Sequence, residues 1–413
     1  MNDKNREQIK EEKTSFADNV VFVSNENGEF KRKKLSPKQT ALVKKITVIG
    51  LLAVIAISAL SIAGASGWLS YERISLKFTD LFKGKSLEEN TPIELNGLKV
   101  SDVDDIGYCF GVLDEFKYYV YSPECNLLYS FNHNMSSPVT ESSSKRVLMY
   151  ERGNYKIKVF SRKGDVFEKN LDNEIITADI NSRNEVIVAC NSERYLGEVK
   201  IFDSNGGEKL TWYSADNYIT DAAISDDGRY FAVSLLRVEN GETVSKTEVF
   251  KVGSTVALTE QVFSGETFFD VCAVNDGFAY VGISKTVFTD KNGAIKATYS
   301  YGGKTLSHFA VSNSAVTLVF EPEGENKYSA VNIDSSANTN YTFKETSLDG
   351  IVAGEDDEIF ICQDGKVQKI SLDSEGKPVK AEINTDGEVI KVLPKDEKLV
   401  ILSISGIDIA ENE

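Results

Sequence analysis

Five side chains recur at a similar place in the C-terminal part of the chain, each about 10 to 12 residues before the middle of the next buried apolar run. They are Asp102, Asp221, Asp270, His308 and Asp349. Carboxylates and an imidazole can bind cations and basic groups. The regular spacing predicts that a repeated element brings these side chains to one binding site. The alternative is that each of them only hydrogen-bonds a neighbouring turn.

Familiar catalytic motifs do not occur in the sequence. It holds no HExxH, CxxC or GxSxG pattern and no glycine-rich phosphate loop. A Ser-His-Asp triad would have to use His133 or His308, and Ser307 does not form one merely by preceding His308. Glycoside hydrolysis would need two carboxyl groups about 5–10 Å apart, which a sequence does not reveal. We therefore predict no catalytic residue, no cofactor and no enzyme activity.

Metal and disulfide chemistry also receive little support. The turns Asp226-Asp227-Gly228 and Asp364-Gly365 resemble fragments of calcium loops, but neither has the full series of ligands, so no metal site is predicted. The five cysteines are too few for a disulfide framework. Three of them lie in apolar runs and are expected in the core: Cys190, Cys272 and Cys362. Cys109 and Cys125 flank a predicted hairpin turn, and a disulfide between them stays open.

The elements that position these residues are short β-strands. Eight buried apolar runs recur about 40 residues apart, beginning at Phe110, Arg146, Glu185, Tyr230, Phe278, Ala315, Glu358 and Lys398. A second strand precedes most runs, and a third and a fourth strand follow. Four strands in each period of about 40 residues are typical of a β-propeller blade. The sequence therefore predicts an all-β propeller with eight four-stranded blades over residues 91–413, with seven blades as the alternative.

Closure of the ring supports the count of eight. The last repeat ends after its third strand, GIDIAEN, whereas an extra strand, TPIEL at Thr91–Leu95, stands at the start of the domain. This strand could complete the last blade and remove an exposed sheet edge. The first strand of each blade would line a central channel, and the five candidate residues would then surround one mouth of that channel.

A single apolar segment divides the chain. Residues 46–69 contain no charge over 24 positions, and about 20 apolar residues span a bilayer. Seven basic residues precede this segment, from Lys31 to Lys45, so we predict a cytoplasmic N-terminus and an extracellular C-terminal domain. The alternative is a cleaved signal peptide with a site at Ala63-Gly64-Ala65, which the long basic region before it disfavours. Residues 70–90 are expected to form a short stalk.

Charge separates the two ends of the chain and limits the partners. Residues 1–45 carry 11 Lys/Arg and 7 Asp/Glu, a net charge of +4. Since the whole chain has a net charge of −17, the remaining residues carry −17 − 4 = −21. So acidic a domain repels nucleic acid and suits a protein or cell-envelope partner with basic groups. The tail is expected to be largely disordered, although Val20–Val23 and Phe30 could belong to a hairpin that is marginal on its own.

The unit AISDDGRYFAVS, Ala223–Ser234, resembles the strand–turn–strand repeat of periplasmic and WD40-like propellers. A basic tail, one apolar segment and a divergent acidic propeller together resemble an uncharacterised family of membrane-anchored propellers of Gram-positive bacteria, a domain of unknown function. The resemblance implies a fold and no chemistry. We expect a binding or scaffold module for a protein or cell-envelope ligand. An envelope sensor that relays through the tail and a glycan-acting propeller enzyme are the alternatives.

Overall fold

The computed structural model describes residues 20–24, 30–34, 93–94, 99–143, 145–322, 327–354, 358–372, 377–383, 385, 389–395 and 398–411. Contacts divide the chain into two units, Met1–Lys85 and Ser86–Glu413. In the first unit, β1 (Val20–Ser24) pairs with β2 (Phe30–Lys34) in an antiparallel hairpin. The predicted membrane segment, residues 46–69, lies outside the described ranges, as do most of the predicted tail and the stalk. Within those ranges, no helix has the length and apolar character needed to cross a bilayer.

The second unit is an eight-bladed β-propeller, as the sequence predicts, and each blade is a four-stranded antiparallel sheet. The innermost strands contact those of neighbouring blades. They are β4 (Val100–Ile106), β8 (Pro138–Ser142), β12 (Ile175–Ile180), β16 (Tyr218–Ile224), β20 (Phe268–Val274), β24 (Leu306–Val311), β28 (Gly350–Ala353) and β32 (Val389–Lys395).

Three further strands complete each blade. The second strands, which contain the eight apolar runs, are β5 (Cys109–Asp114), β9 (Arg146–Glu151), β13 (Val186–Cys190), β17 (Tyr230–Glu239), β21 (Gly277–Gly282), β25 (Ala315–Phe320), β29 (Ile359–Gln363) and β33 (Lys398–Ser403). The third strands are β6 (Lys117–Tyr121), β10 (Lys156–Ser161), β14 (Gly197–Phe202), β18 (Glu242–Lys251), β22 (Lys285–Asp290), β26 (Tyr328–Asp334), β30 (Lys366–Leu372) and β34 (Gly406–Glu411). The outermost strands are β7 (Leu127–Asn132), β11 (Gly164–Asn170), β15 (Glu208–Ser214), β19 (Ala257–Ser264), β23 (Ile295–Ser300), β27 (Thr339–Glu345), β31 (Pro378–Ile383) and β3 (Ile93–Glu94).

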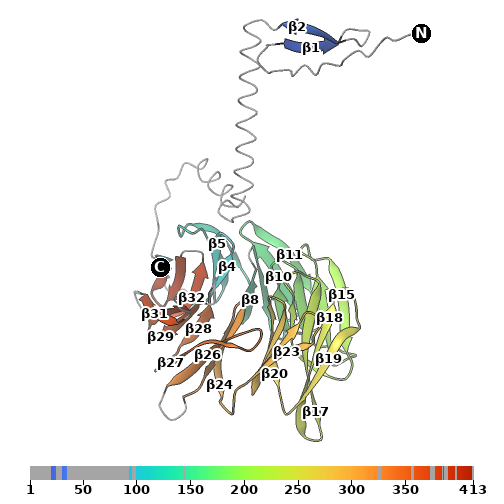
Figure 1. Cartoon of the computed structure of the whole chain (residues 1–413), viewed down its shortest axis with the longest axis vertical. Coiled ribbons are helices and arrows are strands. Elements are labelled where there is room, and N and C mark those ends of the chain that lie inside the picture. Colours follow the sequence, from blue (N-terminus) through green and yellow to red (C-terminus); the bar gives the residue numbers. More distant parts are fainter. Residues whose placement is uncertain are drawn as a thin grey trace, which may run out of the picture. The chain divides into compact units, whose positions relative to one another are not determined.

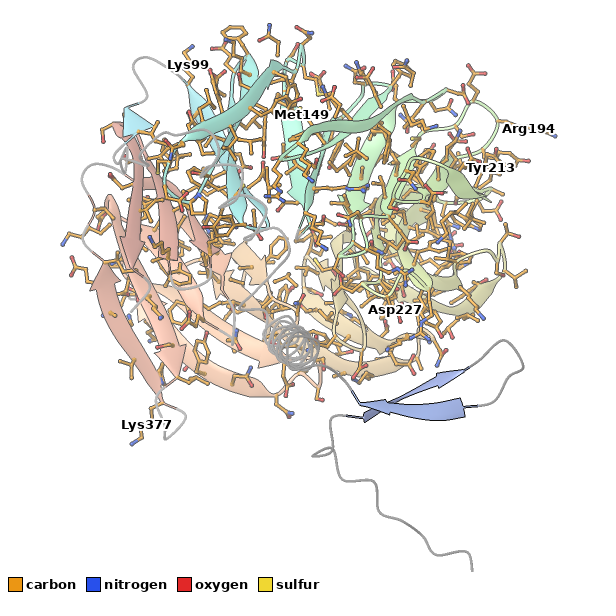
Figure 2. The ribbon with its side chains drawn as sticks, turned by 90° about the horizontal axis from the view of Figure 1, so that it is seen from above. Lys99, Met149, Arg194, Tyr213, Asp227 and Lys377 are labelled. Carbon is orange, nitrogen blue, oxygen red and sulfur yellow. The ribbon has the colours of Figure 1, made fainter. Side chains whose placement is uncertain are left out.

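The N-terminal strand closes the ring. The last blade has the order β3-β34-β33-β32, and Ile93 and Glu94 pair with Ile407 and Gly406. The predicted role of the Thr91–Leu95 strand is thereby confirmed for its described part. In Figure 2 the blades follow one another around a ring, and the C-terminal blade, drawn in red, lies beside the first blade, drawn in cyan.

The hydrophobic core lies between blades rather than at one centre. One buried cluster joins the third and fourth blades and contains Trp212, Phe231 and Phe250. Comparable clusters join other neighbouring blades around the ring. The second strands supply both faces of this packing, which explains why their side chains are buried over almost their whole length. This is the reason for their continuous apolar runs.

Register defines the two faces of the ring. In the first blade, Val100 at the start of β4 lies opposite Asp114 at the end of β5, and Lys117 at the start of β6 lies opposite Asn132 at the end of β7. The start of the innermost strand, the turn between the second and third strands, and the end of the outermost strand therefore share one end of the blade. We call this end the start face. The long β17–β18 hairpin extends from it (Figure 1).

Candidate functional site

The innermost strands of six blades share a β-bulge near the start face, in β4, β12, β16, β20, β24 and β32. A bulge inserts one extra residue and re-aims the side chains beside it. The residues directly after the bulge are Asp102, Thr177, Asp221, Asp270, His308 and Lys391. Four of the five predicted site residues thus occupy equivalent positions on strands that surround the channel. Their role in binding stays a prediction.

Asp349 does not share this position. It lies just before β28, is exposed, and its backbone N–H donates to the carbonyl of Cys362 at 2.8 Å. The strand β28 pairs with β29 without a bulge, so Gly350 rather than Asp349 is the first paired residue of that blade. Sequence spacing grouped Asp349 with the other four residues because strand lengths differ from blade to blade by more than one residue. Spacing therefore does not distinguish Asp349 from Gly350.

Several of the bulge residues tie neighbouring blades together. Oδ2 of Asp221 accepts a hydrogen bond from the backbone N–H of Val271 in the next blade at 2.7 Å. Asp102 forms an ion pair with Lys391, which joins the first blade to the last. These contacts show that the two carboxylates help to hold neighbouring blades together. Such a structural role is close to the alternative considered from the sequence, in which each residue only hydrogen-bonds a neighbouring turn. The bonded atoms are backbone and lysine groups of an adjoining innermost strand rather than a turn.

A second set of carboxylates lies further along the same strands and is missing from the sequence prediction. Asp104 and Asp179 come two residues after Asp102 and Thr177, so they share the face of these bulge residues. Glu141 occupies the position in β8 that Asp179 occupies in β12. Each stands two residues before the residue, Ser143 or Asn181, whose backbone N–H donates to a carbonyl at the start of the next strand. The i, i+2 alternation from Asp102 to Asp104 was the available signal for this set.

These carboxylates act on one another across the channel. Burial raises the pKa of Glu141 to about 8, and the charges of four acids from other blades add to this effect: Asp179, Asp104, Asp270 and Asp221. Part of the Glu141 residue stays accessible to solvent, so the neighbouring strands surround its carboxyl group without sealing it from water. Glu141 and these four acids all lie on innermost strands, which surround the axis of the ring. The channel is therefore lined by acidic groups from the first five blades.

Burial is also the main cause of the raised pKa values of the other channel acids. It raises the pKa of Asp104 to about 7, aided by the charge of Asp102 and opposed by the hydrogen bond that Tyr118 donates at 2.8 Å. It raises the pKa of Asp221 to about 8, with the Asp270 charge as the next cause. The pKa of Asp179 rises to about 6 because burial outweighs two backbone hydrogen bonds. Several channel carboxyls therefore titrate near neutral pH.

This titration predicts how stability depends on pH. Unfolded aspartate titrates near pH 4, whereas Asp104, Asp179 and Asp221 titrate between about 6 and 8 in the fold. The native state binds these protons more tightly, so their stabilising contribution is complete below about pH 4 and is lost as the pH rises to about 8. We expect the free energy of unfolding, measured with urea, to fall between pH 5 and pH 8.5.

The variant Asp221→Asn tests the cause of this pH dependence. Asparagine keeps an oxygen for the N–H of Val271 but removes one charge from the cluster. The variant should be more stable than the parent at pH 8 by roughly 1–3 kcal/mol, with a smaller difference at pH 5. A parent protein that becomes more stable as the pH rises from 5 to 8.5 would contradict this account of the channel.

The channel acids do not form a metal site in the part of the chain that the structure describes, where no group of three or more His, Cys, Asp or Glu side chains could hold an ion. His133 is structural: the N–H of Met135 donates to Nδ1 at 3.1 Å, so the proton on Nε2 points to the carbonyl of Asp114 at 3.0 Å. Cys109 and Cys125 are buried and are not joined to each other, so the disulfide considered from the sequence is not formed. The arrangement suits electrostatic binding of basic groups.

The start face around the channel mouth presents aromatic side chains. Five aromatic residues are exposed by between 41% and 67% among the described residues: Phe116, Tyr155, Tyr213, Tyr218 and Phe269. Phe116 and Tyr155 lie in turns between second and third strands, Tyr213 lies near the end of an outermost strand, and the other two lie at the start of innermost strands. All five therefore belong to the start face. The opposite face has no exposed aromatic residue in the described ranges.

Solved structures with this fold come from several kinds of protein. A eukaryotic initiation factor matches with 13% identity and a TM-score of 0.50, covering 76% of this chain and 85% of its own. Sqt1 from Chaetomium thermophilum, solved bound to the N-terminus of a ribosomal protein, matches with 14% identity and a TM-score of 0.50, covering 76% and 97%. BamB from Moraxella catarrhalis matches with 11% identity and a TM-score of 0.49, covering 75% and 95%. At these identities the likeness shows the fold alone.

Sequence comparison is more specific about the family. No curated protein sequence matches the chain. One family model matches residues 116–411, which extend from the β5–β6 turn of the first blade to the end of β34. The chain therefore belongs to the family of unknown function DUF5711.

Proposed function

We propose that the protein is a membrane-anchored extracellular scaffold whose propeller binds a protein partner on its start face. The observation that carries this proposal is the placement of all five exposed aromatic residues of the described ranges on that face. Aromatic side chains are enriched in protein interfaces, where they supply much of the binding energy. Propellers use such faces because turns from all blades converge there on one broad surface.

The location rests on the sequence. Residues 46–69 form the anchor, and the basic residues before it hold the N-terminus in the cytoplasm. The propeller then lies outside the cell, where its net negative charge keeps it in solvent and favours partners with basic groups. The partner of Sqt1, the N-terminus of a ribosomal protein, offers a precedent for protein binding by this fold and does not identify the partner here.

Single cysteine substitutions can test location and binding in one experiment. The native thiols Cys109, Cys125, Cys190 and Cys362 are buried, whereas Cys272 is half-buried, so each variant is prepared with Cys272→Ala and only the new exposed cysteine reacts. In intact cells, a membrane-impermeant maleimide should label Tyr213→Cys and should not label Ser15→Cys in the tail. A maleimide-linked photocrosslinker on Tyr213→Cys should then yield a defined protein adduct.

Leu372→Cys provides the matched control, because Leu372 is 39% exposed at the end of a third strand and therefore lies away from the start face. It should be labelled in intact cells without giving the same adduct. If the tail is labelled and the propeller is protected, the orientation is wrong. If the two propeller positions give the same adducts, the start face is not the binding surface.

A further inference from the structure

A group of tyrosines lies on the start face of the second, third and fourth blades. We call it the tyrosine surface and define it by Tyr155, Tyr195, Tyr213 and Tyr218 together with Glu174, Asn191 and Arg194. The strands β15 and β16 and the connections before β10, β12 and β14 contribute these residues. Figure 2 shows Tyr213 and Arg194 on the same side of the ring.

Hydrogen bonds join the second blade to the third within this surface. Oη of Tyr155 donates to Oε1 of Glu174 at 3.2 Å, and Nδ2 of Asn191 donates to Oε2 of the same carboxylate at 3.3 Å. The backbone N–H of Asn191 also donates to the carbonyl of Glu174 at 2.8 Å. The Tyr155 ring is therefore held in place while 45% of the residue stays exposed. Such preorganisation lowers the entropy cost of binding.

Ring contacts extend the surface across the third blade. The centroids of Tyr195 and Tyr213 are 4.8 Å apart with an angle of 31° between the rings. The guanidinium of Arg194 lies 5.7 Å from the centroid of the Tyr195 ring. This contact is a cation–π geometry within the chain itself. It shows that a guanidinium fits against a tyrosine of this surface.

The charges around these rings are mostly negative. Four exposed carboxylates lie in the turns and connections of the same region: Asp172, Glu174, Glu193 and Asp216. Two exposed bases, Arg152 and Arg194, lie in the connections of this surface. A cation bound on the tyrosine rings would gain from this field.

Resting on the proposed function, we infer that the tyrosine surface binds a segment of the protein partner that carries arginine or lysine beside apolar residues. Cationic groups of this segment lie against the exposed rings of Tyr213 and Tyr218, one at each ring, as Arg194 lies against Tyr195. The surrounding carboxylates compensate their charge, and the apolar neighbours cover the remaining ring surface. Tyrosine and arginine are, with tryptophan, the residues enriched among those that dominate interface energies.

The test uses the full chain in lipid nanodiscs and two fluorescein-labelled peptides of equal length. One alternates arginine with leucine, and the other alternates glutamate with leucine. Fluorescence anisotropy at low salt should show at least tenfold tighter binding of the arginine peptide. The double variant Tyr213→Ala, Tyr218→Ala should weaken its binding about tenfold, because it removes the two rings that hold the cationic groups. Tyr213→Phe keeps a ring and should bind as the parent does.

Two controls separate the tyrosine surface from general negative charge. Val256→Ala and Leu372→Ala change exposed apolar residues away from the start face, at the approach to β19 and the end of β30, and should leave binding unchanged. Glu193→Gln with Asp216→Asn should weaken the arginine peptide and not the glutamate peptide. Equal binding of both peptides, or unchanged binding by the double tyrosine variant, would overturn the inference. A Tyr213→Cys adduct with a partner lacking basic residues would preserve the proposed function and reject this inference alone.

Discussion

A chain that begins at Leu98 should unfold at a temperature several degrees lower than one that begins at Leu87. The eleven residues that differ include β3, which pairs with β34 through Ile93 and Glu94. Ile93 packs against a buried cluster of the first and last blades that includes Val400, Leu402 and Ile407. Its removal exposes this apolar surface and leaves the outer edge of β34 unpaired.

The expected loss is about 2–4 kcal/mol, since one large apolar side chain contributes roughly 1.5–3 kcal/mol and each backbone hydrogen bond about 1 kcal/mol. The loss is partial because the Asp102–Lys391 and Asp105–Lys395 ion pairs also join the first blade to the last. Thermal unfolding followed by circular dichroism measures the difference, and the longer chain with Ile93→Ala should lie between the two. Identical melting temperatures of the two chains would show that β3 adds no stability.

Gly111→Ala should cost about 2–5 kcal/mol of unfolding free energy, which combines overpacking of about 1–3 kcal/mol with an unmet buried hydrogen bond. A Cβ atom at Gly111 would come within 1.8 Å of Oη and 2.4 Å of Cζ of Tyr118. Tyr118 is fully buried and packs against Phe160 with ring centroids 4.6 Å apart. The ring therefore has no open space to enter.

Displacement of Tyr118 would also break the hydrogen bond that its hydroxyl donates to Oδ2 of the buried Asp104 on the innermost strand. Urea unfolding at pH 7 measures the loss. Gly350→Ala is the matched control, since no atom lies within 4 Å of a Cβ placed there, and it should change stability by less than about 0.5 kcal/mol. Equal stability of the two alanine variants would contradict the packing around Tyr118.

The fold could be predicted from the sequence because every blade needs the same pattern of buried and exposed side chains. A second strand that is packed on both faces needs a continuous apolar run, as in Phe278–Gly282 or Ala315–Phe320. Eight such runs at similar spacing predict eight blades. The missing fourth strand after Gly406–Glu411 similarly predicts that an N-terminal strand completes the last blade, since an unpaired sheet edge is unfavourable.

The candidate site was accessible only in part. Repeated spacing identified Asp102, Asp221, Asp270 and His308 because one bulge recurs in their blades. The same reasoning included Asp349, which stands one residue away from the equivalent position. The exposed tyrosines of the start face had no periodic signal, because they lie in turns and strand ends of different lengths.

Tertiary structure decided the properties that depend on distance between blades. Glu141 and Asp221 are 80 positions apart in the chain, yet their charges interact across the channel and raise the pKa of Glu141. Tyr195 and Tyr213 become neighbours because one lies in the connection before β14 and the other near the end of β15 in the same blade. Burial patterns are local and repeat along a sequence, whereas electrostatic coupling and ring contacts follow from distances in space that only ring closure establishes.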